Sequence, residues 1–210
     1  NGGLKDNAIP RQAEAVIVCP EKRQSEINTK IAVISSEIKH EFLETDPMIL
    51  VEAKKTTLVE KELVMTKDSA DKVITALLCL PGGIQKMSFQ MKGLVQTSLN
   101  LGIMKTEKDH VSLSFSVRSS VESEKRALLD QMACLTKTLG GTVTTNGDYP
   151  AWEYLENSPL RDLMCRIFEE QYGRKPIVEA LHAGVECGIF AGKIPELDCV
   201  SFGPDMKDIH

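Results

Sequence analysis

The strongest constraint on the fold is the segment from Thr97 to Ser120, TSLNLGIMKTEKDHVSLSFSVRSS. Two runs of alternating apolar and polar residues flank a charged tip, and this pattern predicts a β-hairpin. In VSLSFSV the serines alternate with apolar residues, so one face of the strand is apolar and the other is polar. We therefore expect an antiparallel sheet with one face packed and the other solvated.

Three segments around this hairpin have the apolar spacing of amphipathic helices, with apolar residues recurring every three or four positions. These segments are residues 21–42, 68–80 and 122–139. We expect Asp68 to cap the second helix, and Ser119 or Ser120 to cap the third.

Short runs of β-branched residues predict additional strands. These runs are residues 13–20, 46–53 and 142–150. Together with the hairpin, they alternate with the predicted helices along the chain. This order predicts an α+β domain of the ferredoxin-like type over residues 1–150, with helices on one face of an antiparallel sheet.

The composition changes near residue 150, where the only Trp and two of the three Tyr lie close together. A helix with a Ser-Pro start and a Gly end is predicted over 158–173. Two nearly continuous apolar runs follow, PIVEALH and LDCVSFG, which are typical of strands in a parallel sheet. Two strands do not make such a sheet alone, so we assign residues 151–210 to a piece of a second, α/β domain.

The composition weighs against several classes of function. The net charge of −5 and the isoelectric point of about 5.5 argue against nucleic acid as a partner. No apolar run approaches the roughly 18 residues of a membrane span. The six cysteines form no CxxC pair, which favours reduced thiols and a cytoplasmic location. Because the chain starts at Asn1 and stops at His210, we expect it to be part of a longer protein.

Arg118 is the first candidate for ligand binding. It ends the second strand of the hairpin, immediately before the third predicted helix. A guanidinium beside a helix N-terminus forms an anion site, and it can bind a carboxylate through two hydrogen bonds. The alternative is a surface arginine without a ligand.

Further candidates lie in predicted loops and at the chain end. Asn7 precedes a proline and a strand, where an amide caps a turn or contacts a ligand. His182 ends a predicted strand, and Gly184 and Gly188 after it would let the chain pass close to a ligand. Glu186, four residues beyond His182, would share a helical face with it or lie in a turn. His210 follows an apolar strand and a Gly-Pro turn, where ligands collect in α/β sheets, and it could bind a metal. For each of these positions, a loop or terminal residue without a ligand is the alternative.

Seven stretches of the sequence carry a resemblance to a known family. In order, they are NGGLKDNAIPR, LVQTSLNLG, FSVRSSVES, GDYPAWEY, SPLRDLM, HAGVECGIF and SFGPDMKDIH. They closely resemble the bacterial aminoacyl-histidine dipeptidases, also called Xaa-His dipeptidases, of the carnosinase-like di-zinc metallopeptidase family. The resemblance covers essentially the whole chain. It implies that residues 1–150 are most of a lid domain and that 151–210 are the C-terminal part of the catalytic domain.

The resemblance also implies roles for particular residues. His210 matches the last zinc ligand of the family. Arg118 matches the lid arginine that binds the C-terminal carboxylate of the substrate, and Asn7 matches a lid asparagine that lines the substrate site. Gly184, together with His182, matches a loop beside the substrate.

Other residues of the family site have no counterpart in this chain. The H-x-D metal motif, the bridging aspartate and the Glu-Glu pair with the general base have no match here in the resemblance, and H-x-D does not occur in the sequence. For the complete protein, the resemblance implies a cytoplasmic, homodimeric dipeptidase that binds two zinc ions and a dipeptide. This chain would supply no catalytic residue, would bind zinc weakly or not at all, and would be inactive alone. Asn100 is expected to face the same cleft.

Three alternatives remain open at this point: the two that follow, and a chain that pairs with a separate partner supplying the other half of the site. The first is a related metallopeptidase or deacylase that acts on another dipeptide or acyl-amino acid. The second is a stand-alone ferredoxin-like module for binding or dimerisation, because a fold does not determine a function. None of these alternatives involves nucleic acid or a membrane.

Overall fold

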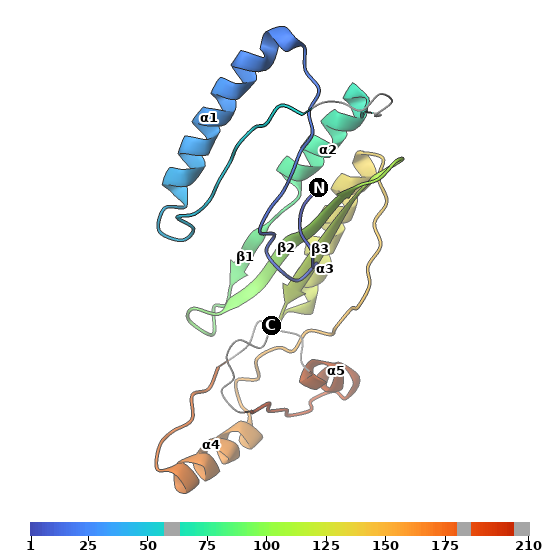
Figure 1. Ribbon diagram of the computed structural model, residues 1–210. Coiled ribbons are helices and arrows are strands. Elements are labelled where there is room, and N and C mark those ends of the chain that lie inside the picture. Colours follow the sequence, from blue (N-terminus) through green and yellow to red (C-terminus); the bar gives the residue numbers. More distant parts are fainter. Residues whose placement is uncertain (57–63, 180–185, 204–210) are drawn as a thin grey trace. The chain divides into compact units, whose positions relative to one another are not determined.

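The computed structural model describes residues 1–56, 64–179 and 186–203 (Figure 1). Contacts divide the chain into two compact units. The first consists of residues 1–14 and 71–210, and the second of residues 15–70. The described residues include no helix that is both long and apolar enough to cross a membrane.

The first unit is built on a three-stranded antiparallel sheet. Its strands are β1 (Gly83–Met87), β2 (Val95–Thr106) and β3 (Val111–Ser119), in the order β1-β2-β3. The predicted hairpin is confirmed as β2 and β3. No strand was predicted at β1, which begins at Gly83, soon after the helix predicted over 68–80.

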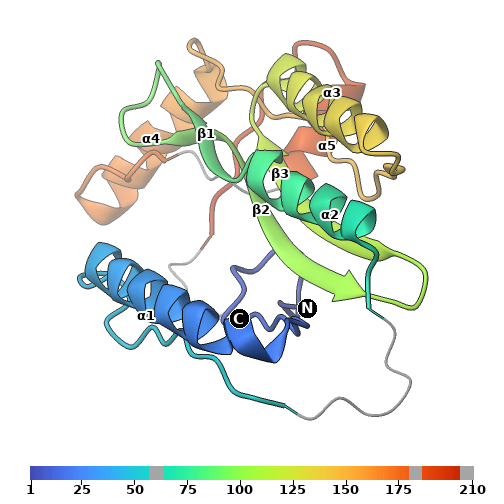
Figure 2. The same cartoon turned by 90° about the horizontal axis from the view of Figure 1, so that it is seen from above.

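Helices pack on one face of this sheet (Figure 2). They are α2 (Lys67–Cys79) and α3 (Glu122–Thr138). The core joins Leu99 of β2 to Leu128 and Met132 of α3, and Leu80, at the end of α2, packs against it. The predicted α+β class, with helices and an antiparallel sheet, is confirmed.

A polar network joins α3 to the edge of the sheet. Glu124 of α3 accepts hydrogen bonds from Gln96 and Thr97 of β2, each at 2.8 Å, and forms an ion pair with Lys86 of β1. Partial burial alone would raise the pKa of the Glu124 carboxyl. Hydrogen bonds from Lys86, Thr97 and Gln96 outweigh burial and hold that pKa below its usual value.

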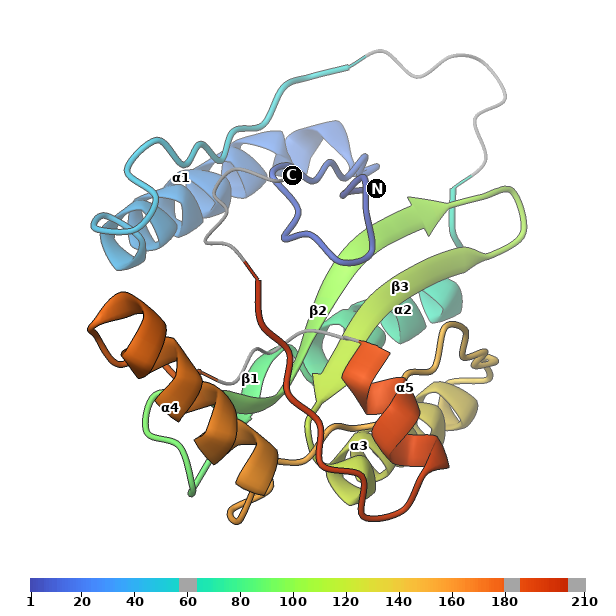
Figure 3. The same cartoon turned by 90° about the horizontal axis from the view of Figure 1, so that it is seen from below.

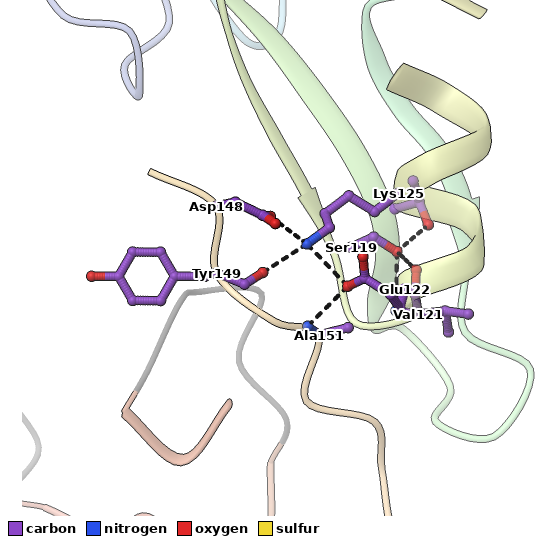
Figure 4. Close-up of polar contacts among 8 residues, drawn as sticks. Ser119, Val121, Glu122, Lys125, Asp148, Tyr149 and Ala151 are labelled. Carbon is purple, nitrogen blue, oxygen red and sulfur yellow. Dashed lines mark hydrogen bonds and ion pairs between the residues drawn. The ribbon is translucent and has the colours of Figure 1, made fainter. Parts of the chain in front are cut away.

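A buried lysine connects α3 to the chain that follows it (Figure 4). The Nζ atom of Lys125 donates to Asp148 Oδ1 at 2.6 Å and to the Tyr149 carbonyl at 2.8 Å, and lies 3.0 Å from Glu122 Oε2. Glu122 also accepts from the backbone N–H of Ala151 at 3.4 Å. Burial disfavours the charged ammonium, but these carboxylates raise the pKa of Lys125 above its usual value. Lys125 thereby fixes residues 148–151 to the first turns of α3.

The C-terminal part of the first unit contains α4 (Pro159–Tyr172) and α5 (Glu186–Lys193). Ser158 caps α4 by accepting from Arg161 N at 3.1 Å, and its hydroxyl donates to Asp198 at 2.6 Å. The hydrogen bond from Ser158 lowers the pKa of the Asp198 carboxyl, and the Leu160 N–H adds to this effect. The chain reverses at Gly173, with φ of 67°, as the predicted glycine stop requires.

Several predicted strands do not form in the described residues. The segments 13–20, 46–53 and 142–150 are irregular, as are the described parts of PIVEALH and LDCVSFG. Ala13 makes only an isolated bridge to Gly2, and Val16 is 65% exposed. A strand is stabilised by hydrogen bonds to a neighbour, and β-branched composition does not supply that neighbour. The strand predictions for 13–20, 46–53 and 142–150 were therefore wrong for the chain as it folds here. PIVEALH and LDCVSFG were predicted to pair with a sheet outside this chain, and that pairing stays a prediction.

The second unit contains a short 3-10 helix, η1 (Glu21–Arg23), which continues into α1 (Gln24–Glu41). The helix predicted over 21–42 is therefore confirmed. Arg23 and Glu26 form an exposed ion pair at 3.1 Å in its first turns. Thr66 accepts a hydrogen bond from Ser69 N at 3.2 Å and so caps α2, in place of the predicted Asp68.

Candidate functional site

The face of the sheet opposite to α3 carries the candidate ligand-binding residues. Thr97 pairs with Ser119, and both face α3, since Thr97 Oγ1 donates to Glu124. Successive strand residues point to opposite faces. The next pair, Ser98 and Arg118, therefore lies on the other face, which we call the polar face. Figure 3 views β2 and β3 with α2 behind them. Two residues further along, Asn100 and Ser116 pair on the same face.

The N-terminal segment lies along β2 and brings Asn7 to the polar face. Asn100 Nδ2 donates to the carbonyl of Ala8 at 2.8 Å and to that of Asp6 at 3.4 Å. Asn7 lies between these two residues and is exposed. Its side chain makes no hydrogen bond with the described residues, so the predicted use of this amide as a turn cap is not observed there.

Two glycines allow this close approach of the N-terminal segment to β2. A Cβ atom on Gly102 would lie 2.2 Å from the Asp6 carbonyl oxygen, and Gly3 has φ of 78° with Gly102 against it. Before the loop, Gly2 exchanges two backbone hydrogen bonds with Met104, at 2.9 and 2.8 Å. Any larger side chain at Gly102 would displace the loop that carries Asn7.

The serine cap predicted beside Arg118, at the N-terminus of α3, is not formed. Val121 precedes α3 without a side-chain cap hydrogen bond. Ser119 instead accepts from Val121 N at 3.1 Å, so the prediction that Ser119 or Ser120 caps the helix was wrong. Arg118 and Ser119 are adjacent in a strand and so point to opposite faces. The Arg118 side chain therefore extends from the face opposite to α3.

The remaining candidate residues lie outside the described residues. These are His182, Gly184 and His210. Glu186, which follows that loop, is the first residue of α5. Gly188 of α5 packs against the Pro150 carbonyl, where a Cβ atom would approach to 2.9 Å. This contact brings the start of α5 close to the segment that Lys125 fixes.

No metal site can be assembled from the described part of the chain. Within residues 1–56, 64–179 and 186–203, no group of three His, Cys, Asp or Glu side chains is arranged to bind an ion. The residues that the structure describes therefore do not fit a zinc centre. Two surface hollows, of about 590 and 370 Å³, lie along α1 and beside α4, and neither is lined by Arg118 or Asn7.

The fold and the polar face define an α+β domain with an arginine and two asparagines gathered on one side of an antiparallel sheet. No protein-family model matches the chain. It is 29% identical over 210 residues to the cytosol non-specific dipeptidase of Escherichia coli (strain K12), across 100% of this chain and 43% of that protein. The predicted resemblance to bacterial dipeptidases is confirmed.

A solved structure agrees with this similarity. The crystal structure of aminoacylhistidine dipeptidase from Vibrio alginolyticus matches with a TM-score of 0.90 and 29% identity. The match covers 97% of this chain and 41% of that chain. The chain thus spans less than half the length of either relative, and its fold is similar to one region of such a dipeptidase.

Residue types and positions singled out Arg118 and Asn7, and the resemblance added Asn100, but neither predicted that Asn100 binds the loop that carries Asn7. The available signal was Gly102, a glycine inside a strand. Such a glycine often marks a bulge or the close approach of another backbone. Both are present here, because the β2–β3 register shifts between Leu101 and Ile103 and the N-terminal loop crosses at Gly102.

Proposed function

We propose that the complete protein is a cytoplasmic metallo-dipeptidase and that this chain supplies part of its substrate site. The proposal rests on similarity to two dipeptidases across nearly the whole chain. Because the chain spans 43% of one relative and 41% of the other, the catalytic machinery would lie in the remainder of the protein. Residues 1–150 would form most of a lid domain, and 151–210 the C-terminal part of the catalytic domain.

The polar face carries the most specific part of this proposal. Arg118 would bind the C-terminal carboxylate of a dipeptide through two charged hydrogen bonds. The Arg118 and Asn100 pairs are two residues apart along the strands, which corresponds to about 7 Å. An extended dipeptide also spans about 7 Å. Its other end would then lie near the loop that carries Asn7, so that the spacing would select substrates of dipeptide length.

Other features of the complete enzyme are proposed from the resemblance. Two zinc ions would be bound mainly by residues outside this chain, with His210 as one ligand and with His182 and Gly184 beside the substrate. A homodimer would form through the lid domain. Among the described strands β3 pairs only with β2, so its outer edge would be open to pairing across a two-fold axis.

We favour Xaa-His dipeptides as substrates. A broader specificity is the second candidate, and the name of the Escherichia coli relative, a non-specific dipeptidase, favours it. The test is hydrolysis of a panel of dipeptides by the complete protein loaded with zinc, with and without a chelator. We expect cleavage of Xaa-His dipeptides, loss of activity with the chelator, and no activity of residues 1–210 alone. Failure to cleave any dipeptide would refute the proposal.

Replacement of Arg118 by Lys gives a sharper test of the polar face. Lysine keeps the positive charge but loses the planar pair of donors. We expect kcat/KM for dipeptides to fall, mainly through a higher KM. Unchanged kinetics of this variant would remove Arg118 from the substrate site.

A further inference from the structure

We propose that Asn100 is a positioning residue that fixes the loop of residues 4–10 and thereby presents the Asn7 amide to the substrate. The inference rests on the proposed function of the polar face and adds a residue to it. Asn100 itself would not need to contact the reacting atoms. Its role is to hold the main chain on both sides of Asn7.

The hydrogen bonds of Asn100 have the geometry that this role requires. Its Nδ2 group has two N–H donors and lies within hydrogen-bond distance of the two carbonyls that flank Asn7. The bond to Ala8, at 2.8 Å, is short, and the bond to Asp6, at 3.4 Å, is long. Two contacts on either side of Asn7 restrict both the position and the rotation of its backbone, whereas one contact would restrict only the position.

The loop has few other attachments to the sheet. Residues 1–3 are fixed to β2 by the Gly2–Met104 pair and by Asn1 Oδ1, which accepts from Thr106 N at 2.7 Å. After Gly3 the chain leaves the strand, and Leu4 is 96% exposed. Within the described residues, the hydrogen bonds that join residues 4–10 to the sheet are those from Asn100. Loss of its donors should therefore release the loop without unfolding the hairpin.

The Asn7 side chain is available for a ligand. It is exposed and makes no hydrogen bond with the described residues, while its backbone is held at both neighbours. An amide presented in this way offers a donor and an acceptor to a peptide group without first breaking an internal bond. Preorganisation of this kind lowers the entropy that substrate binding must overcome.

The experiment uses the complete enzyme with two variants, Asn100→Leu and Asn100→Asp, which have nearly the same size but lack the amide donors. Hydrogen–deuterium exchange of the peptide covering residues 4–11 is the first readout. We expect at least 5-fold faster exchange there in both variants and unchanged exchange in β2 and β3. The control is Ser112→Ala, at the far end of β3, which removes only a 3.5 Å contact with Lys105. Unchanged exchange at 4–11 in the Asn100 variants would overturn the inference.

Kinetics on a Xaa-His dipeptide provide the second readout. Loss of two modest hydrogen bonds predicts a KM about 5- to 10-fold higher, with a smaller change in kcat. Asn7→Ala should have a similar effect, and Asn100→Leu should add little to it in the double variant. Fully additive losses would show that Asn100 acts independently of Asn7, and would overturn the inference. No hydrolysis by the unaltered enzyme would instead refute the proposed function, and the exchange experiment would still decide whether Asn100 anchors the loop.

Discussion

Replacement of Lys125 by Met would remove the charge that connects α3 to residues 148–151 while preserving the length of the side chain. The Lys125 side chain is 8% exposed, so its methylene groups are packed and methionine can occupy the same space. The substitution deletes the hydrogen bonds to Asp148 and to the Tyr149 carbonyl, and the ion pair with Glu122. It tests whether this lysine fixes the segment that follows α3.

The expected magnitude follows from the exposure of each partner. The side chains of Asp148 and Glu122 are 73% and 42% exposed, so each ion pair is screened and contributes only about 0.5 kcal/mol. The charged hydrogen bond to the Tyr149 carbonyl contributes about 1.5–3 kcal/mol. Methionine avoids the cost of burying the ammonium, which offsets part of the loss. We expect a net local destabilisation of about 1–2 kcal/mol.

Hydrogen–deuterium exchange of the complete protein measures this local effect. A loss of about 1–2 kcal/mol corresponds to about 5- to 30-fold faster exchange in the peptide covering residues 146–152. The matched control is Lys137→Met, because Lys137 is an exposed lysine in the last turn of the same helix. This control should leave residues 146–152 unaffected. Equal exchange of that peptide in Lys125→Met and in the unaltered protein would refute the argument.

Two further predictions concern other polar contacts. The pKa of the Glu124 carboxyl is lower in the folded state than in the unfolded state, where it is about 4.3. The ionised carboxylate therefore stabilises the fold above about pH 4.3, and this stabilisation is lost as the pH falls through the lower folded pKa. Glu124→Gln should therefore lower the melting temperature at pH 7, and this difference should shrink below about pH 4; a difference independent of pH would contradict the assignment. Ser158→Ala removes the side chain that caps α4 and should destabilise the first turn of that helix by about 1 kcal/mol. Hydrogen–deuterium exchange near residue 161 should become faster, and unchanged exchange there would argue against Ser158 as the cap.

The elements that could be predicted from the sequence are those whose pattern is sufficient by itself. The alternation of serine and apolar residues in VSLSFSV predicted the hairpin and its polar face. Apolar residues recurring every three or four positions predicted α1 and α3. The β-branched runs at 13–20 and 46–53 predicted strands that the structure lacks. A strand needs a partner at a particular place in space, and single-sequence patterns do not specify that partner.

In the candidate site, too, single residues could be predicted from the local sequence, whereas contacts between distant residues could not. Arg118 and Asn7 were found from their types and their places beside predicted elements. The predicted serine cap of α3 was wrong, although the alternation that puts Arg118 and Ser119 on opposite faces was already visible in the sequence. The contact of Asn100 with the loop joins residues 92 positions apart in the chain, and no local pattern encodes such a contact.

The most direct test of the polar face compares a Xaa-His dipeptide with its C-terminal amide as substrates of the complete enzyme. If Arg118 binds the carboxylate through charged hydrogen bonds, kcat/KM should be about 100-fold higher for the acid than for the amide. In Arg118→Met this ratio should fall close to one, because the preference for the carboxylate disappears with the guanidinium. An acid-to-amide ratio that stays near its original value in Arg118→Met would contradict the account.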